Sequence, residues 1–162
     1  LNVRLDDRLC EMERFGQKNG KGYYRYEAGS RQALRDDDVE ALVIEISTAA
    51  GFERRSISDN EIVERCILGL INEGARILQE GIATSSADID KVYLNGYGFP
   101  AERGGPMAYA DERGVANILE ALMSLQAEHG DFFKPAALLQ QLAEQQRCFA
   151  DVNSSYMNAE SR

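Results

Sequence analysis

The sequence predicts an all-α protein preceded by a short extended segment rich in glycine and tyrosine. Between residues 36 and 150, apolar side chains recur at the three- and four-residue spacing of helices. Residues that start or end helices bound these periodic segments. No segment after residue 36 shows the strict alternation of apolar and polar residues that marks a half-buried strand. The main body is therefore expected to be helical throughout.

Residues 1–35 differ from the rest in composition. The segment RFGQKNGKGYYRYE places three glycines among basic and aromatic side chains, and GYYRY alternates like a short strand or an extended tail. KNGKG looks like a phosphate-binding loop, but the Walker pattern requires Ser or Thr after its lysine, and here Gly22 follows Lys21. Two interpretations stay open: a turn-rich structural tail, and a phosphate contact made by Lys18 and Lys21.

Two helices are expected between residues 36 and 81. The first begins with the acidic residues 36–38, which favour a helix N-terminus, and ends at Gly51. The second begins with a capping box, SDNE at 58–61, and ends at Gly81. Its apolar stripe is broad enough to predict a central, buried helix. The stripe comprises Ile62, Cys66, Leu70 and Ile77, widened by Ile67, Leu68, Ile71 and Leu78.

Three further helices are expected after Gly81. Ser85 and Asp88 stand at capping-box spacing at the start of SSADIDKVYLN. The segment RGVANILEALMSLQAEHG is amphipathic and ends at a glycine. Pro135 suits the first position of a last helix, PAALLQQLAEQQRCF. Residues 151–162 are a polar tail that need not be ordered.

Charge and hydropathy argue against two classes of partner. The formal net charge is −9, made up of +3 over residues 1–35 and −12 over the remainder. An acidic body opposes nucleic-acid binding, because phosphate contacts dominate that affinity. No apolar run approaches the ~20 residues of a membrane span, and no signal peptide is recognised. The length of 162 residues fits one domain, or one domain with a piece of another, and a first residue of Leu1 indicates a processed or truncated chain.

Cysteine and histidine usage predicts no metal site. Cys10, Cys66 and Cys148 are odd in number and lie in no metal-binding spacing. Cys66 falls in an apolar helical pattern, which favours a buried thiol over a reactive or ligating one. The single histidine, His129, precedes Gly130 at an expected helix end. These features predict a protein of the reducing cytoplasm.

Long, ordered motifs resemble one protein family. The stretch EIVERCILGLINEGARILQEGIATSSADIDKVYLNGYGFPAERGGPMAYADERG is similar to the last domain of the multifunctional fatty-acid oxidation enzymes. These enzymes carry enoyl-CoA hydratase and NAD-dependent 3-hydroxyacyl-CoA dehydrogenase activities on one chain. RFGQKNGKGYYRYE resembles the motif that closes their preceding dehydrogenase helical domain, and KPAALLQQLAEQQRCF resembles their final helix. The resemblance implies a helical domain of the 6-phosphogluconate-dehydrogenase C-terminal-like type.

The resemblance also implies a domain division. Residues 1–35 would be the tail of the preceding helical domain, 36–150 a second, degenerate copy of that domain, and 151–162 a polar tail. The NAD-binding Rossmann domain and the dehydrogenase's catalytic His and Glu would lie upstream, and no G-x-G-x-x-G follows a strand in this sequence. Cofactor-binding residues are therefore not expected in this chain, and NAD is expected in the parent enzyme only.

One position departs from the family pattern. In the first copy of the helical domain, a catalytic Asn-Arg pair precedes an Asn-Glu pair by eight positions. Counting back from Asn72-Glu73 reaches Glu64-Arg65, so Glu64 replaces the catalytic Asn and the Arg is retained. A carboxylate there would repel the developing enolate or alkoxide. The resemblance thus implies a non-catalytic duplicate with no catalytic residue of its own.

The stretch NGYGFPAERGGPMAYAD corresponds in the family to a connection within the helical domain. Its rings supply large apolar area, and its glycines and prolines let the backbone fold these rings against neighbouring helices. We expect packing or domain-interface residues here: Tyr93, Tyr97, Phe99, Pro100, Pro106 and Tyr109. The alternatives are a wall of an acyl-CoA pocket and an acid–base pair of Glu102 and Asp111, although Asp111 more simply caps the next helix.

The resemblance implies a two-level function. The parent enzyme would pass hydride from the C3 carbon of its 3-hydroxyacyl-CoA substrate to NAD. This chain would pack against the upstream catalytic helical domain, as a second subunit does in single-copy relatives, and by itself would be inactive and prone to self-association through an exposed apolar face. Two other functions stay open: an acyl-CoA-binding module that uses the basic segment 14–26, and a free-standing helical adaptor.

Overall fold

The computed structural model describes residues 5–152 and divides the chain into two compact units. One unit covers Leu1–Ser56 and the other Ile57–Arg162. Within the described residues the regular elements are all helices, so the all-α prediction is confirmed. The division after Ser56 lies later in the chain than the expected boundary after residue 35. The first predicted helix therefore belongs to the N-terminal unit.

The described part of the N-terminal unit contains two helices, α1 (Leu5–Glu11) and α2 (Asp37–Ala49). α1 lies in the region where the sequence predicted no helix. It packs against α2 over a small core formed by Leu9, Val39 and Leu42. Gly51 follows α2 with a φ of +75°, which agrees with the predicted helix end. The residues between the helices form turns and single antiparallel bridges, which pair Gly16 with Lys21, Lys21 with Arg25, and Arg25 with Leu34.

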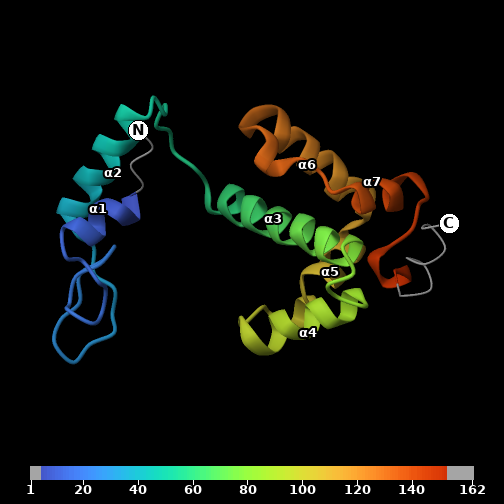
Figure 1. The fold of residues 1–162 in the computed structure, drawn as a ribbon, viewed down its shortest axis with the longest axis horizontal. Helices are drawn as coiled ribbons and strands as arrows, with labels where there is room; N and C mark the ends of the chain where they lie inside the picture. Colours follow the sequence, from blue (N-terminus) through green and yellow to red (C-terminus); the bar gives the residue numbers. More distant parts are fainter. Residues whose placement is uncertain (1–4, 153–162) are drawn as a thin grey trace. The chain divides into compact units, whose positions relative to one another are not determined.

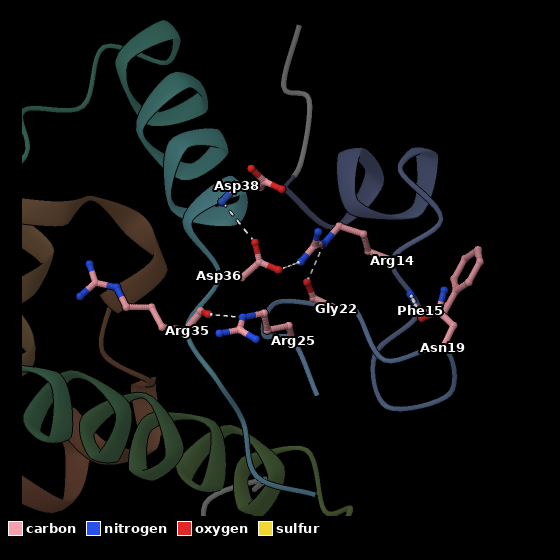
Figure 2. A network of polar contacts seen from close by, with 8 residues as sticks. All are labelled: Arg14, Phe15, Asn19, Gly22, Arg25, Arg35, Asp36 and Asp38. Carbon is pink, nitrogen blue, oxygen red and sulfur yellow. Dashed lines mark hydrogen bonds and ion pairs between the residues drawn. The ribbon is translucent and has the colours of Figure 1, made fainter. Parts of the chain in front are cut away.

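A buried ion pair ties this connection to the start of α2 (Figure 2). The Arg14 guanidinium pairs with the Asp36 carboxylate, and its Nε donates to the Gly22 carbonyl oxygen at 2.9 Å. The other Asp36 oxygen caps α2 by accepting a hydrogen bond from the Asp38 N–H at 3.1 Å. The hydrogen bond from Arg14 holds the pKa of Asp36 below its ordinary value. A Cβ at Gly22 would collide with the backbone of Gly16, so glycine is required there.

The C-terminal unit is built around α3 (Asp59–Gln79), which contacts every other α-helix of the unit (Figure 1). These are α4 (Ser86–Gly96), α5 (Pro106–Arg113), α6 (Val115–His129) and α7 (Ala137–Glu144). Short 3-10 turns join or follow them: η1 (Ala101–Arg103), η2 (Asp131–Phe133) and η3 (Phe149–Asp151). The central position predicted for the second helix is confirmed, and its core neighbours include Met107, Ile118, Leu122, Leu139, Leu142 and Phe149.

The buried face of α3 differs from the expected one. Leu68, Ile71 and Leu78, which the sequence placed at the margin of the stripe, are buried. Ile62 and Cys66, which the sequence placed at its centre, are exposed. The prediction of a buried Cys66 thiol was therefore wrong. α3 carries apolar side chains around more than half of its circumference, so periodicity alone does not decide which side meets the core.

Of three predicted helix starts, one is confirmed and two differ in detail. The Ser58 hydroxyl accepts from the Glu61 N–H at 3.2 Å, as expected of the capping box. Ser85 instead donates its hydroxyl to the Asp88 carboxylate at 2.8 Å and makes no side-chain cap of α4. Pro135 precedes α7 rather than starting it, because the Ala136 N–H donates to the Asn72 side chain and holds this segment extended.

The sequence predicted that Asp111 caps the helix that follows it, and this prediction was wrong. It lies within α5, and its two oxygens accept hydrogen bonds from the backbone N–H groups of Phe149 and Ala150 at 2.7 and 2.9 Å. Asp111 therefore caps η3, a segment distant in sequence. Burial raises the pKa of this carboxyl above its ordinary value. Long-range caps of this kind leave no spacing signature in the sequence.

Candidate docking groove

An apolar groove of about 470 Å³ lies on the C-terminal unit between α3, α4 and the connection to α5. Its lining residues are Val63, Ile67, Leu70, Tyr93, Tyr97, Gly98, Phe99, Pro100, Arg103 and Tyr109. The structure thus brings together five of the six residues that the sequence singled out in this connection. The sixth, Pro106, is buried at the first position of α5 and does not line the groove.

Large apolar and aromatic side chains of the groove are exposed to solvent. Val63 is 60% exposed and Tyr97 is 74% exposed. Ile62, one residue before Val63 on α3, is also exposed. Isolated exposed apolar residues are common on proteins, but a contiguous apolar hollow marks a site that binds something. The groove is therefore a candidate binding surface.

Three aromatic rings form one wall of the groove. The Tyr93 ring lies 5.2 Å from the Tyr97 ring and 6.4 Å from the Phe99 ring, centroid to centroid, and the second pair is edge-to-face. The Phe99 N–H also donates to the Tyr93 carbonyl oxygen at 3.2 Å, which closes the chain after α4. Tyr93 packs against the core, whereas Tyr97 faces water. The aromatic wall is thus anchored to the core through Tyr93 and exposes the Tyr97 ring to solvent.

A buried carboxylate fixes the far end of the connection. Asp90 on α4 accepts hydrogen bonds from the Met107 and Ala108 N–H groups at 2.8 and 3.1 Å and so caps α5. Burial raises the pKa of Asp90 above its ordinary value. The close approach of Asp90 requires Gly105, because a Cβ there would collide with the carboxylate and the residue has a φ of +108°. Sequence spacing gave no sign of this role for Asp90.

Arg103 is the one charged residue among those lining the groove. Its guanidinium carbon lies 5.7 Å from the centroid of the Tyr109 ring, a cation–π distance. Within residues 5–152, Arg103 has no ion-pair partner. The neighbouring cation, Arg113, is already bound by Glu64. The groove therefore combines apolar walls with a single available positive charge.

Glu64 and Arg65, the pair that the resemblance was expected to match with the family's catalytic residues, are both engaged in ion pairs. The Glu64 carboxylate pairs with the Arg113 guanidinium, with one N–O distance of 2.7 Å. Glu64 also raises the pKa of Arg113 through this hydrogen bond. Arg65 pairs with Glu61 at 2.7 Å and lies against the His129 imidazole. His129 ends α6, as predicted, and thereby links α6 to α3.

Lys18 and Lys21, the candidate phosphate contacts, both have exposed side chains in the N-terminal unit. The Lys21 backbone takes part in two of the bridges of the connecting loop. Exposed Tyr23 and Tyr24 follow them directly in the chain. These residues present cationic and aromatic side chains to solvent on a loop whose base is anchored by Arg14.

Residues 5–152 show little that fits a metal or nucleotide. No group of three or more His, Cys, Asp or Glu side chains in this range is arranged to hold a metal ion. A Rossmann-type NAD site needs a parallel sheet with a glycine-rich turn into a helix, and the described residues contain no such sheet. The residues in hand therefore do not fit NAD. None of the described helices has the length and apolarity needed to cross a bilayer.

Sequence reasoning missed Val63, Ile67, Leu70 and Arg103 as members of the groove. Ile67 and Leu70 had been placed in the apolar stripe of α3, whereas Val63 and Arg103 had been given no role. The sequence signal that did point to the groove was the aromatic connection after α4, because five of its predicted interface residues line it.

Comparison with known proteins places the chain among dehydrogenase domains. Residues 62–154 match the family model described as 3-hydroxyacyl-CoA dehydrogenase, C-terminal domain. The chain is 42% identical over 144 residues to the peroxisomal bifunctional enzyme of Homo sapiens, covering 87% of this chain and 20% of the relative. It is 45% identical over 119 residues to the enzyme of the same name from Danio rerio, covering 73% and 17%. The fatty acid oxidation complex subunit alpha of Shewanella amazonensis is 37% identical over 143 residues, covering 88% and 20%.

Proposed function

This chain belongs to the family of 3-hydroxyacyl-CoA dehydrogenase C-terminal domains, and from that premise we propose that it is the carboxyl-terminal part of an NAD-dependent dehydrogenase of fatty-acid β-oxidation. It spans about a fifth of the length of the curated relatives that it matches. In this proposal, the missing four-fifths contains the NAD-binding domain, the catalytic helical domain and the acyl-CoA site. The substrate is a 3-hydroxyacyl-CoA oxidised at C3.

The role of this chain is to pack against the upstream catalytic helical domain without taking part in the chemistry. The observation that carries this proposal is the open apolar groove, whose exposed Val63 and Tyr97 need a covering surface. A non-catalytic role agrees with Glu64, whose carboxylate is engaged with Arg113 and would oppose a developing negative charge. We assign residues 1–35 to the end of the upstream helical domain and the later helices to its degenerate copy.

Turnover by the isolated chain tests the catalytic part of the proposal. The chain is mixed at high concentration with NADH and acetoacetyl-CoA, and NADH loss is followed by absorbance beside an intact dehydrogenase. We expect no consumption above the buffer rate while the control turns over. Clear consumption would contradict the non-catalytic assignment and would point to Glu64 as the first residue to examine.

Self-association tests the packing part. Without its covering partner, the chain is expected to form concentration-dependent oligomers through the groove, which sedimentation velocity detects. Val63→Asp places a charge on the exposed side of α3 and should return the chain to a monomer. Met123→Asp is the matched control, because Met123 is similarly exposed but lies on α6 outside the groove. Equal effects of the two substitutions would contradict a groove-specific contact.

A second candidate function is an acyl-CoA contact by the loop within residues 14–26. It is favoured by the exposed Lys18, Lys21, Tyr23 and Tyr24 on an anchored loop, since ammonium groups bind phosphates and rings stack on adenine. Calorimetry with CoA distinguishes the two proposals. Binding that is lost in Lys18→Ala or Lys21→Ala supports the contact, and absence of heat at millimolar CoA contradicts it.

We also propose a cellular compartment for this protein. All three cysteines are free, which agrees with a reducing environment, and we propose the cytoplasm as the sequence indicated. The animal relatives are peroxisomal by name, whereas the bacterial relatives are not. Fluorescence microscopy of the tagged full-length protein decides between the two locations.

A further inference from the structure

We infer that the segment covering the groove carries a carboxylate that pairs with Arg103. This inference rests on the proposed docking function and adds the chemistry of the partner. The occupant is an apolar segment of the upstream part of the same polypeptide, with an Asp or Glu side chain at the position facing Arg103.

The Arg103 guanidinium is the charged group that a segment covering the groove would meet. It is exposed, it has no ion-pair partner within the described residues, and it lines a groove that is otherwise apolar. Any apolar segment that fills the groove removes water from this group. A charge that is buried without a partner is strongly destabilising, so a covering segment without an anion would bind poorly.

The Arg103 side chain is also held in place by its neighbour Tyr109. The Tyr109 ring under its guanidinium restricts the side chain at a cation–π distance of 5.7 Å. The guanidinium presents a planar set of donors, which matches the two oxygens of a carboxylate. Less side-chain entropy is lost when a positioned arginine binds than when a free one does.

No carboxylate is among the described residues that line the groove. Glu64, the carboxylate nearest in sequence to the lining residue Val63, is bound to Arg113 through two hydrogen bonds. Asp90 and Asp111 accept backbone N–H groups at helix starts. The pairing carboxylate must therefore come from the occupant.

The choice of the upstream polypeptide follows from length and charge. The curated relatives are about five times as long as this chain, so a large covalently linked surface is available at high effective concentration. A second copy of this chain carries a net charge of −9, so charge repulsion weakens self-association and confines it to high concentrations of the isolated chain. The linked segment is thus favoured over a second copy.

Photo-crosslinking in the full-length polypeptide identifies the occupant. A photoreactive benzoylphenylalanine replaces Tyr97, the most exposed ring of the groove, and in a control protein it replaces Met123 on α6. We expect the Tyr97 probe to cross-link to an upstream apolar peptide that contains Asp or Glu, and the Met123 probe not to label that peptide. Cross-links to a second copy, or to a peptide without an acid, would overturn the inference.

Charge reversal separates this inference from the docking proposal. Arg103→Glu, Val63→Asp and Met123→Asp are each placed in the full-length protein, and proteolytic release of the C-terminal unit is timed. We expect Arg103→Glu to accelerate release at least about tenfold, and a second change of the cross-linked acid to Arg to restore the original rate. Acceleration by Val63→Asp alone would leave docking intact and exclude the carboxylate. If neither Arg103→Glu nor Val63→Asp accelerates proteolytic release, the docking proposal itself is refuted.

Discussion

The Glu64 carboxylate accepts two hydrogen bonds from the Arg113 guanidinium and thereby joins α3 to α5. By the resemblance described above, Glu64 is expected to stand where the family's catalytic copy has an asparagine. In this chain the residue has a structural role. It joins two helices that both line the groove, α3 through Val63 and α5 through Tyr109.

We expect Glu64→Asn to lower stability without creating activity. An asparagine amide carries no charge to pair with Arg113. Because both side chains of the pair are partly exposed, the free energy of unfolding should fall by about 0.5–1 kcal/mol. Thermal unfolding measures the loss, and Arg113→Gln should give a similar value. A double mutant no less stable than either single mutant would confirm that the two residues act as a pair. Dehydrogenase turnover in Glu64→Asn would contradict the non-catalytic assignment.

Asn72 should be one of the most sensitive polar residues of the core. Its Oδ1 accepts from the Ala136 N–H at 2.8 Å, and its Nδ2 donates to the Lys134 carbonyl oxygen at 2.9 Å. Asn72→Ala leaves both backbone groups without these partners, so a loss of about 1–3 kcal/mol is expected in denaturant unfolding. The control is Glu73→Ala, which removes only an exposed pair with Arg76 and should change stability by less than about 0.5 kcal/mol.

Removing the Asp90 carboxylate should lower the free energy of unfolding more than removing an exposed acid near it. Asp90→Ala removes the acceptor for two N–H groups at the start of α5, and a loss of about 1–2 kcal/mol is expected. Gly105→Ala should be at least as harmful, because a φ of +108° strains an alanine and its Cβ meets the carboxylate. Calorimetry of both variants, with the exposed Glu102→Ala as reference, checks the order. Equal melting temperatures for Asp90→Ala and Glu102→Ala would contradict the cap.

The Arg14–Asp36 pair should make the N-terminal unit sensitive to acid. Arg14 lowers the pKa of Asp36 in the folded state, so this carboxylate binds its proton less readily when folded than when unfolded. Its stabilising contribution is complete above the unfolded pKa of about 4 and is lost as pH falls through the folded value. Asp36→Asn should therefore destabilise by about 1.5–3 kcal/mol at pH 7 and progressively less below about pH 4.

Tyrosine fluorescence during urea unfolding follows this transition, because the loop anchored by Arg14 carries Tyr23 and Tyr24. Asp37→Asn is the matched control, since Asp37 is exposed beside the cap and should show little effect at any pH. A constant difference between Asp36→Asn and the parent chain from pH 7 to pH 3 would rule out the ion pair as the source of the stability.

The helical class, the helix ends and the central position of α3 could be read from the sequence because they depend on local signals. Gly51, Gly81 and Gly130 end helices where the pattern predicted, since a positive φ is accessible to glycine at little cost. Ser58 caps α3 through its third neighbour along the chain. The amphipathic period likewise predicted α6, whose buried residues in the structure are Val115, Ile118 and Leu122.

Packing between distant segments decided what periodicity could not. The exposure of Cys66, the cap that Asp111 gives to η3 and the cap that Asp90 gives to α5 each depend on residues from another helix. The aromatic residues of the connection were visible in the sequence, but their assembly with Val63 and Arg103 into one groove was not. An apolar residue satisfies the same local pattern in a core and at an interface, and only the tertiary structure shows which side of α3 the rest of the chain leaves open.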